Sequence, residues 1–389
     1  MTAPHPALLD IAARRPPGPV GDEAAFLRSV DEHRMTAAVL AAHERGALRL
    51  ASSTVTTLGM WDLAERRRHL AYWETLREVE SRLAPTGAAV AVLKGIATEA
   101  RWYDELGQRT CRDVDLLLDP GALGEVEAVV DALDPTHGHL STVASMVSRG
   151  LLQHVDLHVG ATQVDLHFDA LKLGIPTLQT REVWAATEVI ATPHGSLRVL
   201  RPEHELVLLL LHLNKDRFAY LGAFLDIERI LTRAPLDESF LRHFVEAEGL
   251  DVLFWMSLAA VADVLALDRE VPRPAGLRAR SWERLWGART RVGGHEARDR
   301  APTISRALLP AHATGRTADI VREARRQVLP PRGLAEIAGR LAPGGSYLRY
   351  LAGRRKSLMA TERASVAASL GAESPADLSS AGRFERRQA

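Results

Sequence analysis

Cysteine and lysine are scarce in this chain, and neither sign of charge is in excess. Cys111 is the only cysteine among 389 residues, which excludes an intramolecular disulfide and a metal cage of thiolates and indicates a reducing, cytoplasmic setting. Basic and acidic residues number 49 each, so the net charge gives no signal for a nucleic-acid or membrane surface. Only four of the basic residues are lysines, so a lysine inside a motif merits notice: Lys94, Lys172, Lys215 and Lys356.

Long hydrophobic runs are absent as well. The most apolar stretches, 206–213 and 252–267, are shorter than the roughly 20 residues that a membrane-spanning helix needs, and they contain His212 and Asp263. The first residues lack the basic start and apolar core of a signal peptide. We therefore interpret both stretches as buried helices and expect no membrane partner.

The composition that remains is that of an ordinary globular protein, with 46% hydrophobic and 25% charged residues in a length that suits two or three domains. Apolar residues at helical spacing extend from residue 22 to about 84 and again from 202 to about 267, with shorter helical patterns at 317–329 and 333–341. We expect four parts: an N-terminal helical segment (1–85), a core (86–200), a C-terminal helical region (201–372) and a disordered tail (373–389).

The core has the pattern of an α+β domain. Residues 88–93 form a short continuous apolar run, which predicts a buried strand that ends at Lys94 and Gly95. The pattern then predicts a short helix at 96–104, a strand at 113–118 and a helix at 120–133 that opens with Pro120. A further pair of strands is expected to end near Leu200.

Strict alternation of polar and apolar residues from 153 to 171 predicts a β-hairpin that turns at Gly160, Ala161 and Thr162. One face of the hairpin is apolar and consists of Val155, Leu157, Val159, Val164, Leu166 and Phe168. The other face is polar and consists of His154, Asp156, His158, Gln163, Asp165, His167 and Asp169. Such a pattern is typical of a sheet with one buried face.

Two acids begin the strand at 113–118. Asp113 and Asp115 are two positions apart, so they share one face with Cβ atoms roughly 7 Å apart. Two carboxylates that close repel each other, and partial burial increases the cost unless a cation is present. Together with a third acid on a later strand and a glycine turn, they predict a platform for divalent ions such as Mg²⁺, which prefers carboxylate oxygens.

Several motifs at these positions resemble the uncharacterised nucleotidyltransferase family of the DNA polymerase β superfamily. The resemblance covers most of residues 25–358 and includes helical motifs in the C-terminal half, among them RPEHELVLLLLHLNKDRF and FLDIERIL. In the core it rests on Leu93-Lys94-Gly95, Tyr103, Arg109 to Leu117 and Val164-Asp165-Leu166-His167. The resemblance implies a small mixed-sheet, polymerase β-like core flanked by helical regions, and transfer of a nucleotidyl group from an NTP with release of pyrophosphate.

The resemblance also implies roles for individual residues. Asp113 and Asp115 would ligate two Mg²⁺ ions, with Mn²⁺ as an alternative, and Asp165 would be the third carboxylate, which serves the catalytic metal and the nucleophile. Gly95 would let the backbone approach the triphosphate at the start of the next helix. The remaining candidates are Lys94, Arg109 and Lys215 for nucleotide binding, and His167, His212 and Asp226 in supporting positions.

Other interpretations remain open for these residues. Asp113 and Asp115 can be a solvated strand edge or ion-pair partners of arginines, and Asp156 is the rival to Asp165. His212, Lys215 and Asp216 have the spacing of simple side-chain pairs on a helix. Cys111 is expected to be a packed small residue rather than a nucleophile.

Two other functions compete with nucleotidyl transfer. One is a noncatalytic nucleotide-binding or scaffold protein of the same fold. The other is a zinc hydrolase that uses the hairpin histidines His154, His158 and His167. The sequence does not identify the acceptor, so a small molecule, a peptide, a protein and an RNA end all remain candidates.

Overall fold

The structure is a computed structural model that describes residues 4–135, 154–170, 180–216 and 218–276, with single positions at 147, 152 and 279. All described elements belong to one unit, residues 1–294. The helices predicted at 317–329 and 333–341 and the predicted tail lie outside the described residues. The division of the unit into segments that end at residues 85 and 200 stays a prediction.

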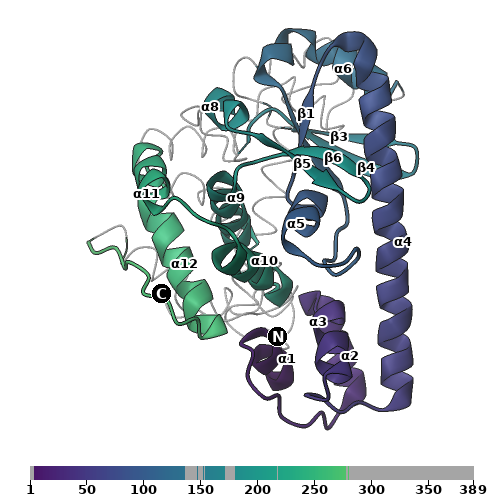
Figure 1. Ribbon diagram of the computed structural model, residues 1–389, viewed down its shortest axis with the longest axis vertical. Helices are drawn as coiled ribbons and strands as arrows, with labels where there is room; N and C mark the ends of the chain where they lie inside the picture. Colours follow the sequence, from purple (N-terminus) through teal and green to yellow (C-terminus); the bar gives the residue numbers. More distant parts are fainter. Residues whose placement is uncertain are drawn as a thin grey trace, which may run out of the picture. The chain divides into compact units, whose positions relative to one another are not determined.

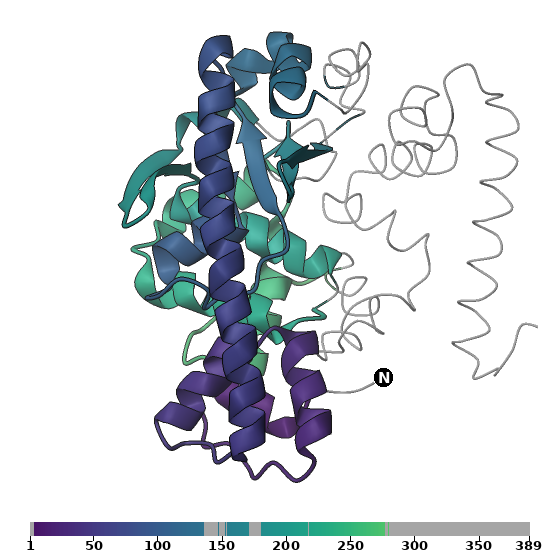
Figure 2. The same ribbon diagram turned by 90° about the vertical axis from the view of Figure 1, so that its right-hand side faces the viewer.

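Four helices precede the sheet (Figure 1): α1 (Pro6–Ala12), α2 (Glu23–His33), α3 (Thr36–Glu44) and α4 (Ser52–Leu83). The carboxylate of Asp22 accepts a hydrogen bond from Ala25 N at 2.9 Å and so caps the start of α2. Helix α4 is 32 residues long and extends along one side of the sheet, with α2 and α3 packed near its first turns (Figure 2). The helical prediction for 22–84 is confirmed, whereas the short helix α1 was not predicted.

The sheet has six strands in the order β3-β4-β2-β1-β6-β5. They are β1 (Val90–Leu93), β2 (Val114–Leu118), β3 (His154–Val159), β4 (Thr162–His167), β5 (Glu188–Thr192) and β6 (Gly195–Val199). The pairs β2·β4 and β1·β6 are parallel and the other three are antiparallel, so the sheet is mixed. The predicted α+β class with a mixed sheet is therefore confirmed.

The hairpin β3-β4 buries its apolar face and leaves its polar face for other contacts. Val155, Leu157, Val164 and Leu166 are buried, and α4 packs against both strands of the hairpin. The hydroxyls of Thr75 on α4 and Thr162 on β4 are 2.8 Å apart. Thr162 belongs to β4, so the turn is shorter than predicted and consists of Gly160 and Ala161.

Two helices beside the sheet differ in their regularity. The short helix predicted at 96–104 is α5 (Gly95–Trp102), which packs against β1 and β2. The helix predicted at 120–133 is instead a 3₁₀ segment, η2 (Pro120–Glu125), followed by α6 (Val126–Leu133). Gly121 and Gly124 lower the helix propensity of this first part, and the Asp119 carboxylate accepts a hydrogen bond from Gly121 N at 2.7 Å.

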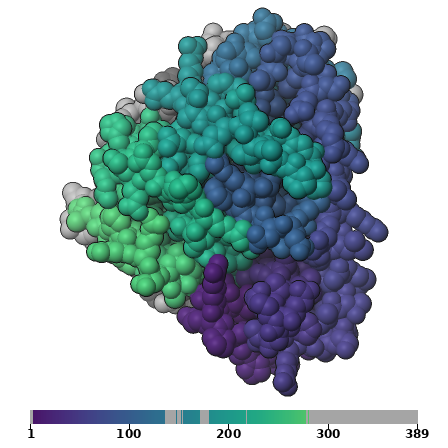
Figure 3. Space-filling model, viewed as in Figure 1, coloured from purple at the N-terminus to yellow at the C-terminus, as the bar shows by residue number. Residues whose placement is uncertain are grey.

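Helix α8 (Thr180–Ala185) precedes β5, and the described helices after the sheet carry most of the remaining core: α9 (Pro202–Lys215), α10 (Leu221–Arg233), α11 (Glu238–Ala247) and α12 (Asp251–Leu265). The predicted buried helices at 206–213 and 252–267 are α9 and α12, and α10 packs against α5 and α9. Among the described residues, no helix is both long and apolar enough to cross a membrane. In Figure 3 the N-terminal helices, the core and the helices after it share one continuous face.

Candidate functional site

Carboxylates from three neighbouring strands form one row across the sheet. Asp115 of β2 pairs in register with Asp165 of β4, and Asp165 pairs with Asp156 of β3. Residues that pair in register project from the same face of a sheet, so the first two side chains lie side by side. Asp115 is 3% exposed, whereas the Asp156 side chain on the outer strand is 61% exposed.

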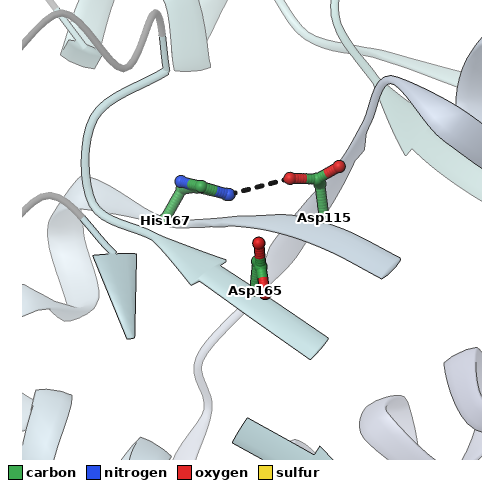
Figure 4. A group of neighbouring side chains, drawn as sticks. All are labelled: Asp115, Asp165 and His167. Carbon is green, nitrogen blue, oxygen red and sulfur yellow. Dashed lines mark hydrogen bonds and ion pairs between the residues drawn. The ribbon is translucent and has the colours of Figure 1, made fainter. Parts of the chain in front are cut away.

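Asp115, Asp165 and His167 form a group that could hold a metal ion. Each offers one ligand atom, and the three atoms lie within 4.8 Å of one another. Figure 4 shows the Asp165 carboxylate pointing between the other two side chains, with His167 Nε2 at 3.0 Å from Asp115 Oδ1. Two carboxylates suit Mg²⁺ or Mn²⁺, and an imidazole nitrogen also suits Zn²⁺, so this donor set fits a divalent ion.

The electrostatics of the group favour a cation. Burial, and after it the negative charge of Asp115 beside it, raise the pKa of Asp165 to about 6. A hydrogen bond that Gln163 Nε2 donates to the Asp165 carboxylate, at 3.1 Å, acts in the opposite direction. The sheet thus concentrates negative charge at this point, where a bound dication would offset the repulsion.

Lys94 lies against the same group. Its Nζ is 2.9 Å from Asp115 Oδ2, and its side chain is 9% exposed. Lys94 precedes α5 with φ of 42°, a left-handed conformation that only glycine adopts without strain. The backbone strain at Lys94 and the buried ion pair coincide at the turn between β1 and α5, and strained backbone of this kind clusters at functional sites.

Gly95 begins α5 with φ of 37°. A Cβ atom at this position would lie 3.5 Å from Cys111 Sγ and 3.8 Å from both Arg109 Nη1 and the Asp113 carbonyl oxygen. The start of α5 therefore packs against the segment that leads into β2. The backbone approach to phosphate that the resemblance assigns to Gly95 stays a prediction.

Asp113 lies just before β2 and is half-buried. Its charge contributes to the raised pKa of Asp165, so the two carboxyl groups are near each other. Asp113 is not part of the group of three ligand atoms. Metal ligation by Asp113 stays a prediction, and Asp115 pairs with Lys94 and His167.

Arg109 is paired with Asp226 of α10. Its Nε and Nη2 donate to the Asp226 carboxylate at 2.9–3.0 Å, and Tyr103 donates its hydroxyl proton to Asp226 Oδ1 at 2.6 Å. The side chains of Arg109 and Asp226 are 16% and 4% exposed. The structure thus brings these two candidates together as an ion pair, and a direct contact of Arg109 with nucleotide stays a prediction.

The end of α9 adds His212 to the surroundings of Lys94. His212 Nδ1 is 3.2 Å from Asp216 Oδ2, which is the helix pair that its spacing suggests. Burial, and after it the positive charge of Lys94, lower the pKa of His212 to about 4. Lys215 is exposed, and the charge on its side chain also acts on His212.

The three hairpin histidines are not all at one place. The rings of His154 and His167 have centroids 5.2 Å apart, but His154 Nε2 lies near Asp156 Oδ1 at 3.4 Å. His158 is exposed and pairs in register with Gln163. Among the described residues, only His167 of the three belongs to the candidate metal group.

A buried network between α4 and the segment before β2 was missed by the sequence reasoning. His69 Nδ1 contacts the Glu99 carboxylate, and Glu99 Oε1 accepts a hydrogen bond from Arg109 N at 3.0 Å. Glu65 Oε1 accepts one from Cys111 N at 2.8 Å. The spacing of Glu65 and His69, four residues apart on a helix, is the only sequence signal that could have indicated part of this network.

This network also defines the surroundings of Cys111. Burial by itself would lower the pKa of His69, but hydrogen bonds with Cys111, Glu65 and Glu99 raise it to about 11. Cys111 is buried with a free thiol, and its Sγ accepts a hydrogen bond from Arg109 Nη1 at 3.1 Å. Its environment is a packed one, as expected, although a histidine that is distant in sequence lies beside it.

Comparison with known proteins gives one family and one similar structure. Residues 20–266 match a family model described as an uncharacterised nucleotidyltransferase. The crystal structure of an antigenic nucleotidyltransferase-like protein from Paracoccidioides brasiliensis is similar to this chain at 14% identity and a TM-score of 0.31, over 58% of this chain and 93% of that chain. No curated protein matches the chain.

Proposed function

The chain belongs to the uncharacterised nucleotidyltransferase family, and from this premise we propose that it moves a nucleotidyl group from an NTP, such as ATP, to an acceptor and releases pyrophosphate. The observation that carries the proposal is the register of Asp115 with Asp165 on neighbouring parallel strands, with His167 beside them. A cytoplasmic setting, where NTP and Mg²⁺ are both available, is part of the proposal.

A divalent ion, Mg²⁺ or Mn²⁺, is assigned to Asp115 and Asp165, with Asp113 as a further carboxylate and His167 as a supporting group. The raised pKa of Asp165 supports this assignment, since it reflects burial and repulsion by the charge of Asp115, and a dication would relieve both. Such an ion, or a pair of them, would supply charge stabilisation for the phosphoryl group. With this assignment, nucleotidyl transfer depends on the metal ion, and Asp165 is the carboxylate nearest to the reacting atoms.

The residues of the chain then have distinct tasks. Asp165 orients the acceptor hydroxyl and takes its proton while the acceptor oxygen bonds to the α-phosphorus of the NTP and the bond to pyrophosphate breaks. Lys94 and the N-terminal end of α5 hold phosphate oxygens, because a cation and free backbone N–H groups favour an anion. Arg109 and Asp226 keep the segment before β2 in position, and Lys215 contributes positive charge at the end of α9.

A noncatalytic nucleotide-binding protein is the second candidate, and one observation favours it. Lys94 Nζ lies 2.9 Å from Asp115 Oδ2, so the chain itself supplies a cation to the carboxylate that would otherwise hold the metal. In a catalytic protein, metal binding must compete with Lys94 for Asp115. The two candidates differ in turnover, because the second binds NTP and transfers nothing.

The test of nucleotidyl transfer uses the whole chain with Mg²⁺, α-³²P-labelled NTPs and separate pools of small molecules, peptides, proteins and RNA ends. We expect label to enter one pool, and Asp115→Asn and Asp165→Asn to reduce transfer by roughly 10³-fold, since charge stabilisation by metal contributes several kcal/mol. The matched control is Asp156→Asn, which removes an exposed carboxylate from the same row. It is expected to transfer at nearly the parent rate.

Three outcomes would count against the proposal. Asparagine variants that transfer label as well as the parent would refute the assignment of Asp115 and Asp165. Tight NTP binding without transfer to any pool would favour the noncatalytic protein. Stoichiometric zinc in the purified chain, measured by elemental analysis, together with hydrolysis that requires it, would favour the zinc hydrolase.

A further inference from the structure

Arg34 has a backbone conformation that its residue type disfavours. It follows α2 with φ of 58° and ψ of 46°, the left-handed conformation that ends many helices and that glycine adopts most easily. An arginine here costs free energy that glycine would not, because its Cβ crowds the backbone. Strained residues of this kind cluster at functional sites, so the contacts of the Arg34 guanidinium are of interest.

The guanidinium of Arg34 has a stacking partner but no ion-pair partner among the described residues. Its Cζ lies 4.1 Å from the centre of the Tyr220 ring, a cation–π contact with the residue that precedes α10. Its Nε is buried and has no hydrogen-bond partner in the part of the chain that the structure describes. A charged donor in that position has unused capacity to bind an anion.

Two further arginines come close to Arg34. Burial lowers the pKa of Arg34, and the positive charges of Arg112 and Arg109 lower it further, while Tyr220 and Asp216 act in the opposite direction. Asp226 neutralises Arg109 through its ion pair, whereas among the described residues neither Arg34 nor Arg112 forms an ion pair. The three side chains therefore concentrate positive charge that the chain compensates only in part.

This concentration of positive charge lies next to the candidate site. Arg109 Nη1 would be 3.8 Å from a Cβ atom on Gly95, at the start of α5, and the Asp113 carbonyl oxygen would be equally near. The negative charges of Asp115 and Asp165 stand on β2 and β4, where a divalent ion is proposed. A ligand that spans both regions must carry several negative charges and also bind a metal, which is the chemistry of a triphosphate.

We propose that Arg34 and Arg112 bind the triphosphate chain of the NTP, so that an arginine from the N-terminal helical segment completes a site otherwise built from the core. This inference rests on the proposed function and extends it to residues outside the predicted set. The Tyr220 ring orients the planar guanidinium of Arg34, which donates N–H hydrogen bonds to two phosphate oxygens at once. Arg112, which is exposed, provides a second guanidinium with paired N–H donors.

The test measures affinity by calorimetry for each of the four common NTPs and for inorganic triphosphate, which needs no base recognition, with Mg²⁺ and the whole chain. Arg34→Gly removes the guanidinium and relaxes the backbone at the same time. We expect it to weaken both kinds of ligand by about 10- to 100-fold, the usual effect of losing charge-assisted hydrogen bonds, with no fall in the urea midpoint of unfolding. Arg34→Lys keeps the positive charge but loses the paired N–H donors of the guanidinium. Its affinity for both ligands should lie between those of the parent and of Arg34→Gly.

Arg14→Gly is the matched control. Arg14 also has a left-handed backbone, with φ of 54°, but its side chain is 75% exposed and pairs with Glu228 at 2.6 Å. It should leave the affinity for both ligands unchanged. If Arg34→Gly fails to fold, Arg34→Asn repeats the test, because asparagine tolerates the left-handed conformation.

Each outcome has one meaning. Equal affinity of the parent and Arg34→Gly for NTP and inorganic triphosphate overturns the inference and leaves the proposed function standing. Inorganic triphosphate that binds through Arg34, without binding of any NTP, shows an anion site at Arg34 but overturns its assignment to an NTP, together with the proposed function. A parent protein that binds neither ligand overturns both.

Discussion

At the scale of single residues, two buried histidines show how neighbours decide a charge. His69 lies beside two carboxylates, and hydrogen bonds overcome burial and raise its pKa to about 11. His204 packs against the rings of Phe240 and Phe244, and burial lowers its pKa to about 4. Both are nearly inaccessible, so the difference comes from the available partners and not from the degree of burial.

The low pKa of His204 predicts how the free energy of unfolding changes with pH. Its pKa is about 4 in the folded chain and 6.5 as a free side chain, so the unfolded chain binds the proton more readily. The stabilisation is fully present above pH 6.5 and is lost as pH falls toward 4, by about 3 kcal/mol in total at 1.36 kcal/mol per pH unit. His204→Leu should lack this part of the acid sensitivity.

Urea unfolding of the parent and of His204→Leu at pH 7, 5 and 4 measures the effect. The other titrating groups are common to both proteins, so the difference between the two curves isolates His204. Free energies of unfolding that fall in parallel from pH 7 to pH 4 would contradict the assignment of a neutral buried His204.

At the scale of elements, the segment between α5 and β2 has little regular structure and depends on side chains from other elements. Glu99 and Glu65 accept backbone hydrogen bonds from Arg109 and Cys111 in this segment. Asp226 of α10 holds the Arg109 side chain from the other side. Helices α4, α5 and α10 therefore determine where β2 begins, and with it where Asp113 and Asp115 stand.

The Arg109–Asp226 pair makes the element-scale prediction. Arg109→Gln leaves the buried Asp226 carboxylate without its cation, which should cost about 3–5 kcal/mol of unfolding free energy. The double variant Arg109→Gln, Asp226→Asn replaces the charged pair with a neutral one and should recover most of that loss. Denaturant unfolding of the parent, both single variants and the double variant provides the measurement.

If a single variant loses less than about 1 kcal/mol of unfolding free energy, the pair does not hold the segment before β2 against α10. The stable double variant has a second use. The double variant is folded but lacks the Arg109 charge. If its NTP affinity equals that of the parent, the predicted nucleotide contact of Arg109 is wrong.

At the scale of the whole molecule, the proposed site draws on three parts of the chain. We propose that the core contributes Asp115 and Asp165, that the helices after it contribute His212 and Asp226, and that the N-terminal segment contributes Arg34. Any ligand that binds at this point should therefore stabilise all three parts together, since it binds the folded chain and not the unfolded one.

A divalent ion provides the whole-molecule prediction. Addition of Mn²⁺ or Mg²⁺ at about 100 times its dissociation constant should stabilise the parent by about 2.7 kcal/mol, and EDTA should reverse the gain. Asp165→Asn should be more stable than the parent without metal, because it removes the repulsion by Asp115, and should gain almost nothing from metal. Thermal unfolding with and without metal measures both effects.

The same measurement has a clear negative result. If Asp165→Asn is less stable than the parent without metal and is stabilised by Mn²⁺ as strongly as the parent, the carboxylate is a structural partner and not a ligand. The control Asp156→Asn should behave as the parent does under both conditions, since its carboxylate is exposed.

The sequence by itself determined the features that depend on neighbours along the chain. Alternation predicted the β3-β4 hairpin and its two faces, because the pleat places every second side chain on one side. Spaced apolar residues predicted α4, α9 and α12. The motifs around Lys94 and Asp113 indicated the family, which the family model confirms.

Only the tertiary structure decided which distant residues meet. Arg109 and Asp226 are 117 positions apart and His69 and Glu99 are 30 apart, and no local pattern specifies either pair. Asp165 stands beside Asp115, and Asp156 one strand further out, because β2 and β4 pair in parallel in one particular register. The physical reason is that periodicity shows which face of an element is buried, whereas the packing of whole elements selects the partner that the face receives.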